Sequence, residues 1–374
     1  MTPTTETELA EAIAAANGPL RIRGGGTRDI GAPVDGATLT TAGLTGVTLY
    51  EPGALTLVVQ AGTPLDEVEA LLAAEGQRLA FEPGDMRALL GTEGTPTIGG
   101  VIATNASGPR RIQAGAARDF CLGVRFVDGQ GQVLKNGGRV MKNVTGYDLV
   151  KLMTGSWGTL GVMTEVSLKV LAIPETEATL VCADKSAETA VASMAAALGS
   201  PFDVTGAAMM NGQTMIRVEG LEQSVAYRAK ALQDGVLQGF DIVEGAASAR
   251  MWADLRDLTP FAGKEGAVWR ISVKPSDGPA LVRELGALSP EAIFDWGGGL
   301  VWLRIADEED AGAQMIRNDL SHMGGHATLV RASAATRAAV PVFHPEPAPL
   351  AALSRGLRAK FDPRGILNPG LMGA

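Results

Sequence analysis

Hydrophobic residues near the start of the chain recur in runs that alternate between the periods of strands and helices. Segments 47–51 (VTLYE) and 55–62 (LTLVVQAG) are β-branched and aliphatic runs bounded by Gly and Pro, which is typical of strands. In segment 63–76, apolar residues recur at helical spacing after Thr63, which can cap a helix, and Pro64, which suits the first helical position. The pattern predicts two strands followed by a helix.

Two further segments of this region predict antiparallel strands. Segment 121–137 (CLGVRFVDGQGQVLKNG) predicts a hairpin that turns at its Asp-Gly dipeptide, because Asp-Gly supplies the positive φ of a tight turn. Segment 160–173 (LGVMTEVSLKVLAI) alternates as a further pair of strands does. The composition of the sequence changes at Pro174 and the acidic residues after it. We therefore expect the first domain to cover residues 1–174.

The next part of the chain, residues 175–345, alternates apolar strands with alanine-rich helices such as 186–198 and 222–233. This order predicts a second domain with two βαβ-type units in an α+β sheet. We expect the last segment, 346–374, to return to the first domain. Its helical stripe, which should pack there, consists of Leu350, Leu353, Leu357 and Phe361.

Composition and charge limit the number of domains and the classes of partner that the chain can bind. The 374 residues are 46% hydrophobic and 20% charged, enough for two domains with separate cores. The net charge is −9, Lys and Arg are scattered and aromatic residues are 5%, which excludes the electrostatic pattern of a nucleic-acid binder. The two cysteines, Cys121 and Cys182, are too far apart in sequence for a metal-like pair and too few for a disulfide framework, which fits a reducing cytoplasm.

The start of the chain carries Glu6, Glu8 and Glu11, where a signal peptide needs positive charge. No apolar run reaches the about 18 to 20 residues that cross a bilayer. We therefore expect a cytoplasmic protein without direct membrane insertion, which reaches the inner face of the membrane only through partners.

Three consecutive glycines follow a short strand-like stretch in segment 23–29 (RGGGTRD). A Rossmann unit is excluded because segment 29–41 shows no helical period, and no P-loop motif occurs. Two interpretations stay open from this stretch alone. Consecutive backbone N–H donors can form an anion site, or the glycines can mark a flexible hairpin loop.

Two more stretches are rich in glycine and small polar residues. Segment 82–126 contains Pro-Gly, Thr-Ile-Gly-Gly and Thr-Asn-Ala-Ser-Gly within a short distance, too many such residues for a packed helix. Segment 142–170 (KNVTGYDLVKLMTGSWGTLGVMTEVSLKV) has glycines at three-residue spacing, which alone indicates only turns or close backbone packing. A ligand could fill the space left by the missing side chains.

In this order and spacing, the three stretches resemble the FAD-binding domain of the vanillyl-alcohol oxidase superfamily, the PCMH-type FAD domain. The segments ATNASGPRR, KNVTGYDLVKLMTGSWGTLGV, GGHATLVRA and FDPRGILNPG resemble the FAD-binding E subunits of bacterial glycolate oxidases over the whole chain. The resemblance implies an α+β protein: a PCMH-type domain of two α+β subdomains around FAD, then an α+β cap domain.

The resemblance also implies positions for the cofactor. The pyrophosphate would be held by backbone donors of Gly24, Gly25, Gly26, Thr27 and Arg28. The pyrophosphate and isoalloxazine side would be lined by Gly99, Gly100, Thr104, Asn105, Ser107 and Gly108, with Pro83 beside the rings. The ribose and adenine would meet Gly161 and Val162, and the flavin edge Asn368.

The flavin should be bound non-covalently. Relatives that bond their flavin use a His, sometimes with a Cys, in these loops, whereas the first histidine here is His322. Cys121 lies in an apolar run and is expected to be a small buried hydrophobe.

The catalytic residues are not identified by the sequence. The resemblance implies an H-x-G-D-G-N-x-H motif in catalytically competent caps, which this chain lacks, and Trp157 stands where many relatives have Glu. Two glycines between His322 and His326 make a shared helix improbable, so we expect no metal site there. Arg110 and Arg111 could attract a substrate carboxylate or face solvent.

The resemblance implies the FAD subunit of a three-part glycolate oxidase that converts glycolate, a small 2-hydroxy acid, to glyoxylate. A larger homologous FAD subunit and an iron-sulfur subunit would be its partners. The alternatives are a free-standing FAD-linked D-2-hydroxy-acid dehydrogenase and a non-catalytic structural or electron-relay subunit.

Overall fold

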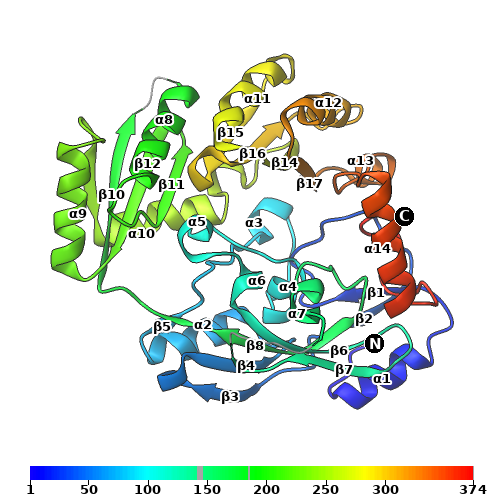
Figure 1. Cartoon of the computed structure of the whole chain (residues 1–374). Helices are drawn as coiled ribbons and strands as arrows, with labels where there is room; N and C mark the ends of the chain where they lie inside the picture. Colours follow the sequence, from blue (N-terminus) through cyan, green and yellow to red (C-terminus); the bar gives the residue numbers. More distant parts are fainter. Residues whose placement is uncertain (141–145, 184–185, 374) are drawn as a thin grey trace. The chain divides into compact units, whose positions relative to one another are not determined.

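The computed structural model describes residues 1–140, 146–183 and 186–373. Part of the third predicted motif, residues 142–145, lies outside the described residues. The chain forms two compact units (Figure 1). The first contains residues 1–107, 115–173 and 345–373, and the second contains 108–114 and 174–344.

The first unit contains a small parallel sheet and a larger antiparallel one. Strands β1 (Leu20–Arg23) and β2 (Ala37–Thr40) pair in parallel. The larger sheet has the order β3-β4-β8-β6-β7, formed by β3 (Val47–Glu51), β4 (Thr56–Gln60), β8 (Val162–Lys169), β6 (Cys121–Val127) and β7 (Val133–Gly137). A short pair joins β5 (Gln77–Arg78) and β9 (Leu171–Ala172). The helices are α1 (Glu6–Ala14), α2 (Leu65–Ala74), α3 (Arg87–Leu90), α4 (Ile98–Ala103), α6 (Ala117–Phe120), α7 (Leu149–Met153) and α14 (Ala348–Phe361).

The strands, the helix and the hairpin predicted for this unit are confirmed, but the predicted cap and turn residues need correction. Strands β3 and β4 and helix α2 form where expected, but Pro64 is the N-cap of α2 and the Thr63 hydroxyl donates to the Gln60 carbonyl at 2.8 Å. The hairpin β6–β7 also forms, yet its positive φ lies at Gly131. At Gly129 a Cβ would instead collide with Asp362 of the C-terminal segment.

Segment 160–173 forms two strands, as predicted, but they do not pair with each other. Strand β8 pairs with β4 and β6, whereas β9 pairs with β5. The alternation marked a strand correctly, but its partners come from distant segments.

The core of the first unit joins both ends of the chain. Leu20 of β1 lies in an isolated parallel bridge with Leu367, and the Leu20 amide donates to the Ile366 carbonyl at 2.7 Å. The buried residues of this cluster are Leu9, Ile13, Leu20, Leu39, Leu44, Val127, Val162, Ile366 and Leu367. The C-terminal segment is thus part of this core.

The second unit carries, among the described residues, one eight-stranded antiparallel sheet of order β13-β10-β12-β11-β15-β16-β14-β17. Its strands are β10 (Thr176–Ala183), β11 (Gly206–Met210), β12 (Gln213–Gly220), β13 (Asp241–Glu244), β14 (Ala267–Ser272), β15 (Glu291–Asp295), β16 (Leu300–Ile305) and β17 (His326–Arg331). Its helices are α5 (Arg111–Ala114), α8 (Ala187–Leu198), α9 (Glu222–Asp234), α10 (Gly245–Arg256), α11 (Gly278–Glu284), α12 (Ala313–Met323) and α13 (Ala334–Ala339).

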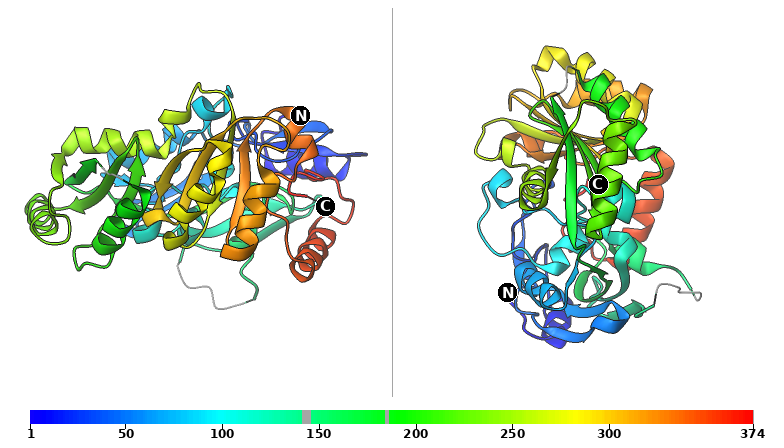
Figure 2. Two further views of the ribbon diagram at one scale, coloured as in Figure 1. Left: turned by 90° about the horizontal axis from the view of Figure 1, so that it is seen from above. Right: turned by 90° about the vertical axis from the view of Figure 1, so that its left-hand side faces the viewer.

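The chain order in this unit is βαββαβ, repeated twice. In each repeat the two strands around the first helix are parallel in direction but separated by an antiparallel third strand, the split βαβ arrangement. The predicted helices 186–198 and 222–233 are confirmed, and each βαβ-type unit has an antiparallel strand between its two strands. Helices α8, α9, α11 and α12 lie along one face of the sheet, and α10 lies on the other (Figure 2).

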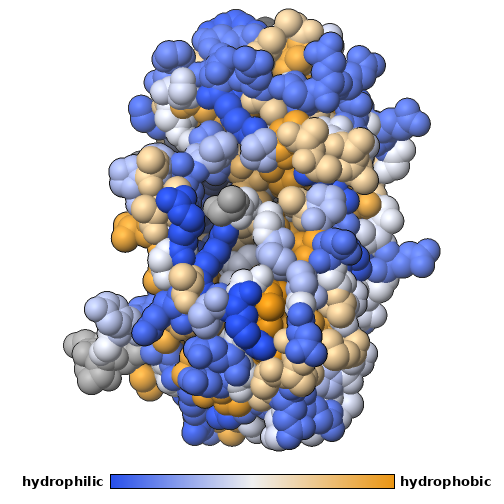
Figure 3. Space-filling view, turned by 90° about the vertical axis from the view of Figure 1, so that its right-hand side faces the viewer, coloured by the Kyte–Doolittle hydropathy of each residue, from blue (hydrophilic) through white to orange (hydrophobic). Residues whose placement is uncertain are grey.

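Helix α14 does not bury its leucines as predicted. Leu353 is 66% exposed, and only Phe361 packs inward, with its ring 6.1 Å from that of Phe126. Figure 3 shows hydrophobic side chains scattered among hydrophilic ones. Of the helices in the described part of the chain, none has the length and apolar character to cross a bilayer.

Candidate functional site

The glycine loop follows β1 directly, at residues 24–28. Gly26 has a φ of +75°, and the side chain of Thr27 is buried. Within the described residues, the backbone N–H groups of Gly25, Gly26 and Thr27 have no protein acceptor. Consecutive amides of this kind form a concave donor site for an anion.

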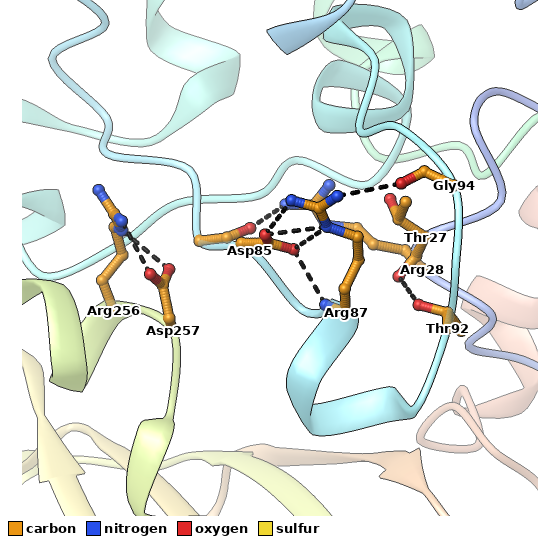
Figure 4. Close-up of polar contacts among 9 residues, drawn as sticks. Thr27, Arg28, Asp85, Arg87, Thr92, Gly94, Arg256 and Asp257 are labelled. Atoms are coloured by element: carbon orange, nitrogen blue, oxygen red, sulfur yellow. Dashed lines mark hydrogen bonds and ion pairs between the residues drawn. The ribbon is translucent and has the colours of Figure 1, made fainter. Parts of the chain in front are cut away.

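The second glycine-rich stretch packs against this loop without space for side chains. A Cβ on Gly25 would collide with the carbonyl oxygen of Thr95, and one on Gly24 would lie 2.5 Å from the Thr97 hydroxyl. The Thr92 hydroxyl donates to the Thr27 carbonyl at 3.1 Å (Figure 4). The first two predicted stretches are therefore in direct contact.

Charged side chains fix the segment around Pro83, which is itself buried. Arg28 donates to the Gly84 carbonyl. Arg87 binds the Asp85 carboxylate at 2.7 Å and the Gly94 carbonyl at 3.1 Å (Figure 4). Burial opposes ionisation of Asp85, but the hydrogen bonds from Arg87 outweigh it and lower the pKa of Asp85.

Thr97 is the N-cap of helix α4, and its hydroxyl accepts from the Gly100 amide at 3.2 Å. The Ile98 and Gly99 amides donate to the backbone carbonyls of Thr63 and Ala61, so the N–H groups in its first turn already have protein acceptors. A Cβ on Gly99 would lie 2.6 Å from Ala61. Gly99 therefore serves close packing of α4, and the unpaired donors lie in loop 24–28.

The remaining predicted residues of this stretch hold its backbone in place. The Thr104 hydroxyl donates back to the Gly100 carbonyl at 2.9 Å. Asn105 has a φ of +50°, and its side-chain oxygen accepts from the Arg118 amide at 2.9 Å. The Ser107 hydroxyl accepts from the Ala117 amide at 2.9 Å.

The third stretch meets the second through backbone hydrogen bonds. The Gly155 amide donates to the Ile102 carbonyl at 3.1 Å, and the Trp157 amide to the Ala103 carbonyl at 2.9 Å. The Arg118 guanidinium donates to the Thr154 carbonyl at 2.7 Å. These bonds hold the described part of the third stretch beside α4.

Asn368 links the C-terminal segment to the first and third stretches. It is buried, with a φ of +45°. Its side-chain oxygen accepts from the Ile22 amide at 2.7 Å, and its side-chain amide donates to the Trp157 carbonyl at 2.8 Å. All three glycine-rich stretches and the tail therefore converge in the first unit.

Gly161 and Val162 lie deeper than the loop residues. Val162 belongs to the core, and a Cβ on Gly161 would lie 2.7 Å from the Phe126 ring. Only their backbone could face a ligand. Cys121 is buried as predicted, and burial raises the pKa of its thiol to about 12.

Several residues that shape this region were not singled out from the sequence. They are Thr92, Gly94, Thr95, Thr97 and Arg118. The signal for the first four was available, because TEGTPTIGG is a run of small hydrogen-bonding residues. Nothing in the local pattern marks Arg118.

Residues 108–114, which lie within the second stretch, belong to the second unit. Arg110 is buried and pairs with Glu219 at 3.2 Å, so the solvent-facing alternative was wrong for this residue. The indole N–H of Trp296 donates to the Gly108 carbonyl at 3.0 Å, and Arg111 lies 4.3 Å from the Trp296 ring centroid. Gly108 thus packs within the second unit.

The histidines are placed separately. His322 lies in the last turn of α12, whereas His326 begins β17, as expected from the intervening glycines. The His344 imidazole accepts from the Ala327 amide at 3.4 Å. Burial lowers the pKa of both His326 and His344. Within the described ranges, no group of three or more His, Cys, Asp or Glu residues could hold a metal ion.

The chain resembles known proteins both in sequence and in structure. Residues 1–137 match the family described as FAD binding domain. The chain is 39% identical over 356 residues to glycolate oxidase subunit GlcE of Escherichia coli K12, which covers 95% of this chain and 92% of that protein. It is 32% identical over 145 residues to D-lactate dehydrogenase of Anaerostipes hadrus, covering 39% of this chain and 29% of that enzyme. Alkyldihydroxyacetonephosphate synthase shares the fold with a TM-score of 0.71 and 17% identity, over 99% of this chain and 75% of the other.

Proposed function

We propose, since the chain belongs to the family of the glycolate oxidase subunit GlcE, that it is the FAD-binding subunit of a heteromeric glycolate oxidase. It is an FAD-dependent oxidoreductase with the α+β fold of PCMH-type flavoproteins. In the proposed reaction, glycolate is oxidised to glyoxylate and the electrons pass to partner subunits.

The observation that carries the proposal is the convergence of three separated stretches on a loop of free amides. The N–H groups of Gly25, Gly26 and Thr27 supply donors without a charged side chain, which suits a diphosphate. The donor set of the loop therefore fits FAD. We assign the pyrophosphate to residues 24–28.

The other predicted residues have supporting roles in this proposal. Pro83 and the 99–108 segment line the pyrophosphate and isoalloxazine side, Gly161 and Val162 offer backbone to the ribose and adenine, and Asn368 fixes the flavin edge. FAD, when bound, supplies the hydride acceptor. The high pKa of Cys121 and its burial support non-covalent binding.

The electrons need a further carrier. The chain has only two cysteines, whereas an iron-sulfur cluster commonly takes four. We therefore propose an iron-sulfur subunit and a larger homologous FAD subunit as partners. The first domain, residues 1–174 with 346–374, would bind FAD, and residues 175–345 would form the cap.

The test is to purify the chain alone and with its partners, and to record the visible spectrum before and after anaerobic addition of glycolate. The proposal expects a yellow protein with one FAD released by denaturation, and bleaching of the flavin band with glycolate in the complex. A protein that takes up no FAD would refute the FAD site. A complex whose flavin stays oxidised with glycolate would refute the substrate.

A free-standing D-2-hydroxy-acid dehydrogenase is the second candidate, favoured by the likeness to D-lactate dehydrogenase. The same experiment separates the two. Bleaching of the isolated chain by D-lactate, with no response to glycolate, would favour the second candidate. A yellow isolated chain that responds to neither acid and only bleaches in the complex would favour the subunit.

A further inference from the structure

Helix α14 of the first unit carries an exposed apolar stripe (Figure 1). Leu350, Leu353 and Leu357 are 53%, 66% and 40% exposed. Their spacing of i, i+3 and i+7 places the three side chains in one line along the helix, which we call the leucine stripe. Within the described part of the chain, no other helix presents three exposed large apolar side chains in this way.

The contacts that fasten α14 to its unit lie in its last turn. The Arg358 guanidinium donates to the Gly373 carbonyl at 2.7 Å. The Phe361 carbonyl accepts from the Gly129 amide at 2.9 Å. None of the residues of α14 is buried. A helix of this length is marginal in water without tertiary packing, and Gly356 in its middle weakens it further, so covering the leucine stripe would stabilise α14.

Charges of opposite sign lie near the two ends of the stripe. Glu346 precedes Leu353 by seven residues, and Lys360 follows Leu353 by seven. Both charged side chains are exposed, and neither has an ion pair or hydrogen bond with another described residue. Arg355 lies on the opposite side of the helix by its spacing from the stripe. In either direction from Leu353, the chain therefore presents one leucine and then one charge, and the two charges have opposite signs.

We propose that the leucine stripe binds a second copy of this chain, with two α14 helices packed antiparallel about a two-fold axis at Leu353. A two-fold contact brings the same surface of both copies together. Leu353 then meets its own counterpart, and Leu350 of each copy meets Leu357 of the other. Glu346 of each copy lies beside Lys360 of the other. The antiparallel arrangement also places the positive end of each helix dipole beside the negative end of the other.

Other occupants fit the stripe less well. A helix that lies on a membrane surface has a broad apolar face and a polar face rich in Lys and Arg. The leucine stripe is instead the narrow seam that paired helices bury, and a carboxylate, Glu346, lies near one end. A helix of another protein could cover three leucines, but the exchange of Glu346 and Lys360 is a match that the chain makes with itself. This contact does not depend on the assignment of FAD or glycolate.

The dimer should be weak and reversible. Three partly exposed leucines from each copy supply only part of the about 1,200–2,000 Å² that a stable interface buries. We therefore expect a dissociation constant of roughly 10–100 µM. Added salt should weaken the dimer, because the two ion pairs are exposed to solvent.

The experiment is sedimentation velocity of the full FAD-loaded chain at concentrations on both sides of this range. The variants are Leu353→Ser, Glu346→Lys, Lys360→Glu and the exchanged variant that combines both charge reversals. The control variant is Leu221→Ser, the same substitution at a leucine of the second unit that is 64% exposed. Melting temperatures of all variants show whether a loss of dimer is a loss of folding.

We expect Leu353→Ser to weaken the dimer about tenfold or more, because a substitution at the axis removes a leucine from both sides of the contact. Each single charge reversal should weaken it about threefold to tenfold, since it creates two like-charged pairs. The exchanged variant should recover most of the wild-type affinity. Leu221→Ser should dimerise as the wild type does.

The proposal is overturned if the wild type stays monomeric, if Leu353→Ser dimerises as the wild type does, or if the exchanged variant dimerises no better than the single reversals. The charge variants keep the test valid if Leu353→Ser unfolds. A monomeric chain that binds vesicles of anionic phospholipid through Leu353 would overturn it in favour of a membrane surface. FAD content is measured separately, and loss of FAD with a retained dimer would count against the proposed function alone.

Discussion

Gly26 tolerates a side chain where its neighbour Gly25 does not. A Cβ on Gly25 would collide with the Thr95 carbonyl, so any substitution there disturbs packing as well as ligand binding. A Cβ on Gly26 would meet only the Arg23 side chain, at 3.6 Å. Its positive φ is a conformation that Asn and Asp accept more readily than other residues.

This difference makes Gly26→Asp and Gly26→Asn a matched pair that differs only in charge. If the amides of this loop hold the pyrophosphate, the carboxylate should weaken FAD binding about tenfold or more beyond the Asn variant, through like-charge repulsion. Titration of the apoprotein with FAD, followed by quenching of flavin fluorescence, measures both. Equal affinities would place the diphosphate elsewhere.

The two cysteines should differ in reactivity. Cys121 is buried and its thiol pKa is about 12, so almost no thiolate forms at neutral pH, whereas Cys182 is partly exposed. We expect a thiol reagent to label Cys182 in the native protein and Cys121 only after unfolding. Mass spectrometry of the labelled peptides reports the sites. Native labelling of Cys121 would contradict its burial.

At the scale of elements, the buried side chain of Asn368 bonds the C-terminal segment to the backbone of two other segments. Asn368→Ala would leave the Ile22 amide and the Trp157 carbonyl without these bonds. We expect the free energy of unfolding to fall by about 1–3 kcal/mol, because a hydrogen bond contributes about 0.5–1.5 kcal/mol and this variant loses two of them. Urea unfolding measures the change.

The control for this prediction is Asn318→Ala, the same substitution at an exposed position of α12. It should change stability by no more than a few tenths of a kcal/mol, since an exposed helical position favours Ala. Equal effects of the two substitutions would mean that Asn368 does not fasten the tail.

The order of elements was predictable because it depends on local patterns, whereas their pairing was not. The alternation in segment 160–173 identified β8, but its partners β4 and β6 lie far away in the sequence. The same holds for the second unit, where a third strand inserts between the two strands of each βαβ pattern. Periodicity shows which face of an element is buried, and long-range packing decides what covers it.

The candidate site was partly predictable for a related reason. Consecutive glycines have no side chains to shield their backbone N–H groups, so the anion site in loop 24–28 could be predicted from the sequence. The contact between Arg111 and Trp296 could not, because these two residues are separated by more than 150 positions. Arg111 lies within the second glycine-rich stretch, yet packs in the second unit.

At the scale of the molecule, acid should weaken the fold in two stages. His326 and His344 have pKa values lowered by burial, so their protonation is less favourable in the folded chain than in the unfolded one. Their contribution to stability is complete at high pH and falls once the pH drops below about 6.5, where the unfolded chain takes up protons. The fall ends below the folded pKa values.

In the second stage, at lower pH, stability is lost because carboxylates become protonated. The hydrogen bond from Arg125 lowers the pKa of Glu6, despite partial burial, so its stabilising contribution is present above the ordinary value of 4.5. That contribution is lost as the pH falls through the lower, folded value. The two stages therefore occur in different pH ranges and can be measured separately.

One pair of variants tests whether His326 causes the loss of stability in the first stage. His326→Asn should flatten the decrease in unfolding free energy between about pH 7.5 and pH 5, because one of the two imidazoles with a lowered pKa no longer titrates. His322→Asn, the same change on the exposed surface of α12, is the control. Tryptophan fluorescence in urea reports mainly on the second unit, which contains Trp252, Trp269, Trp296 and Trp302. If both variants kept the wild-type slope, the acid sensitivity would have to come from groups other than His326.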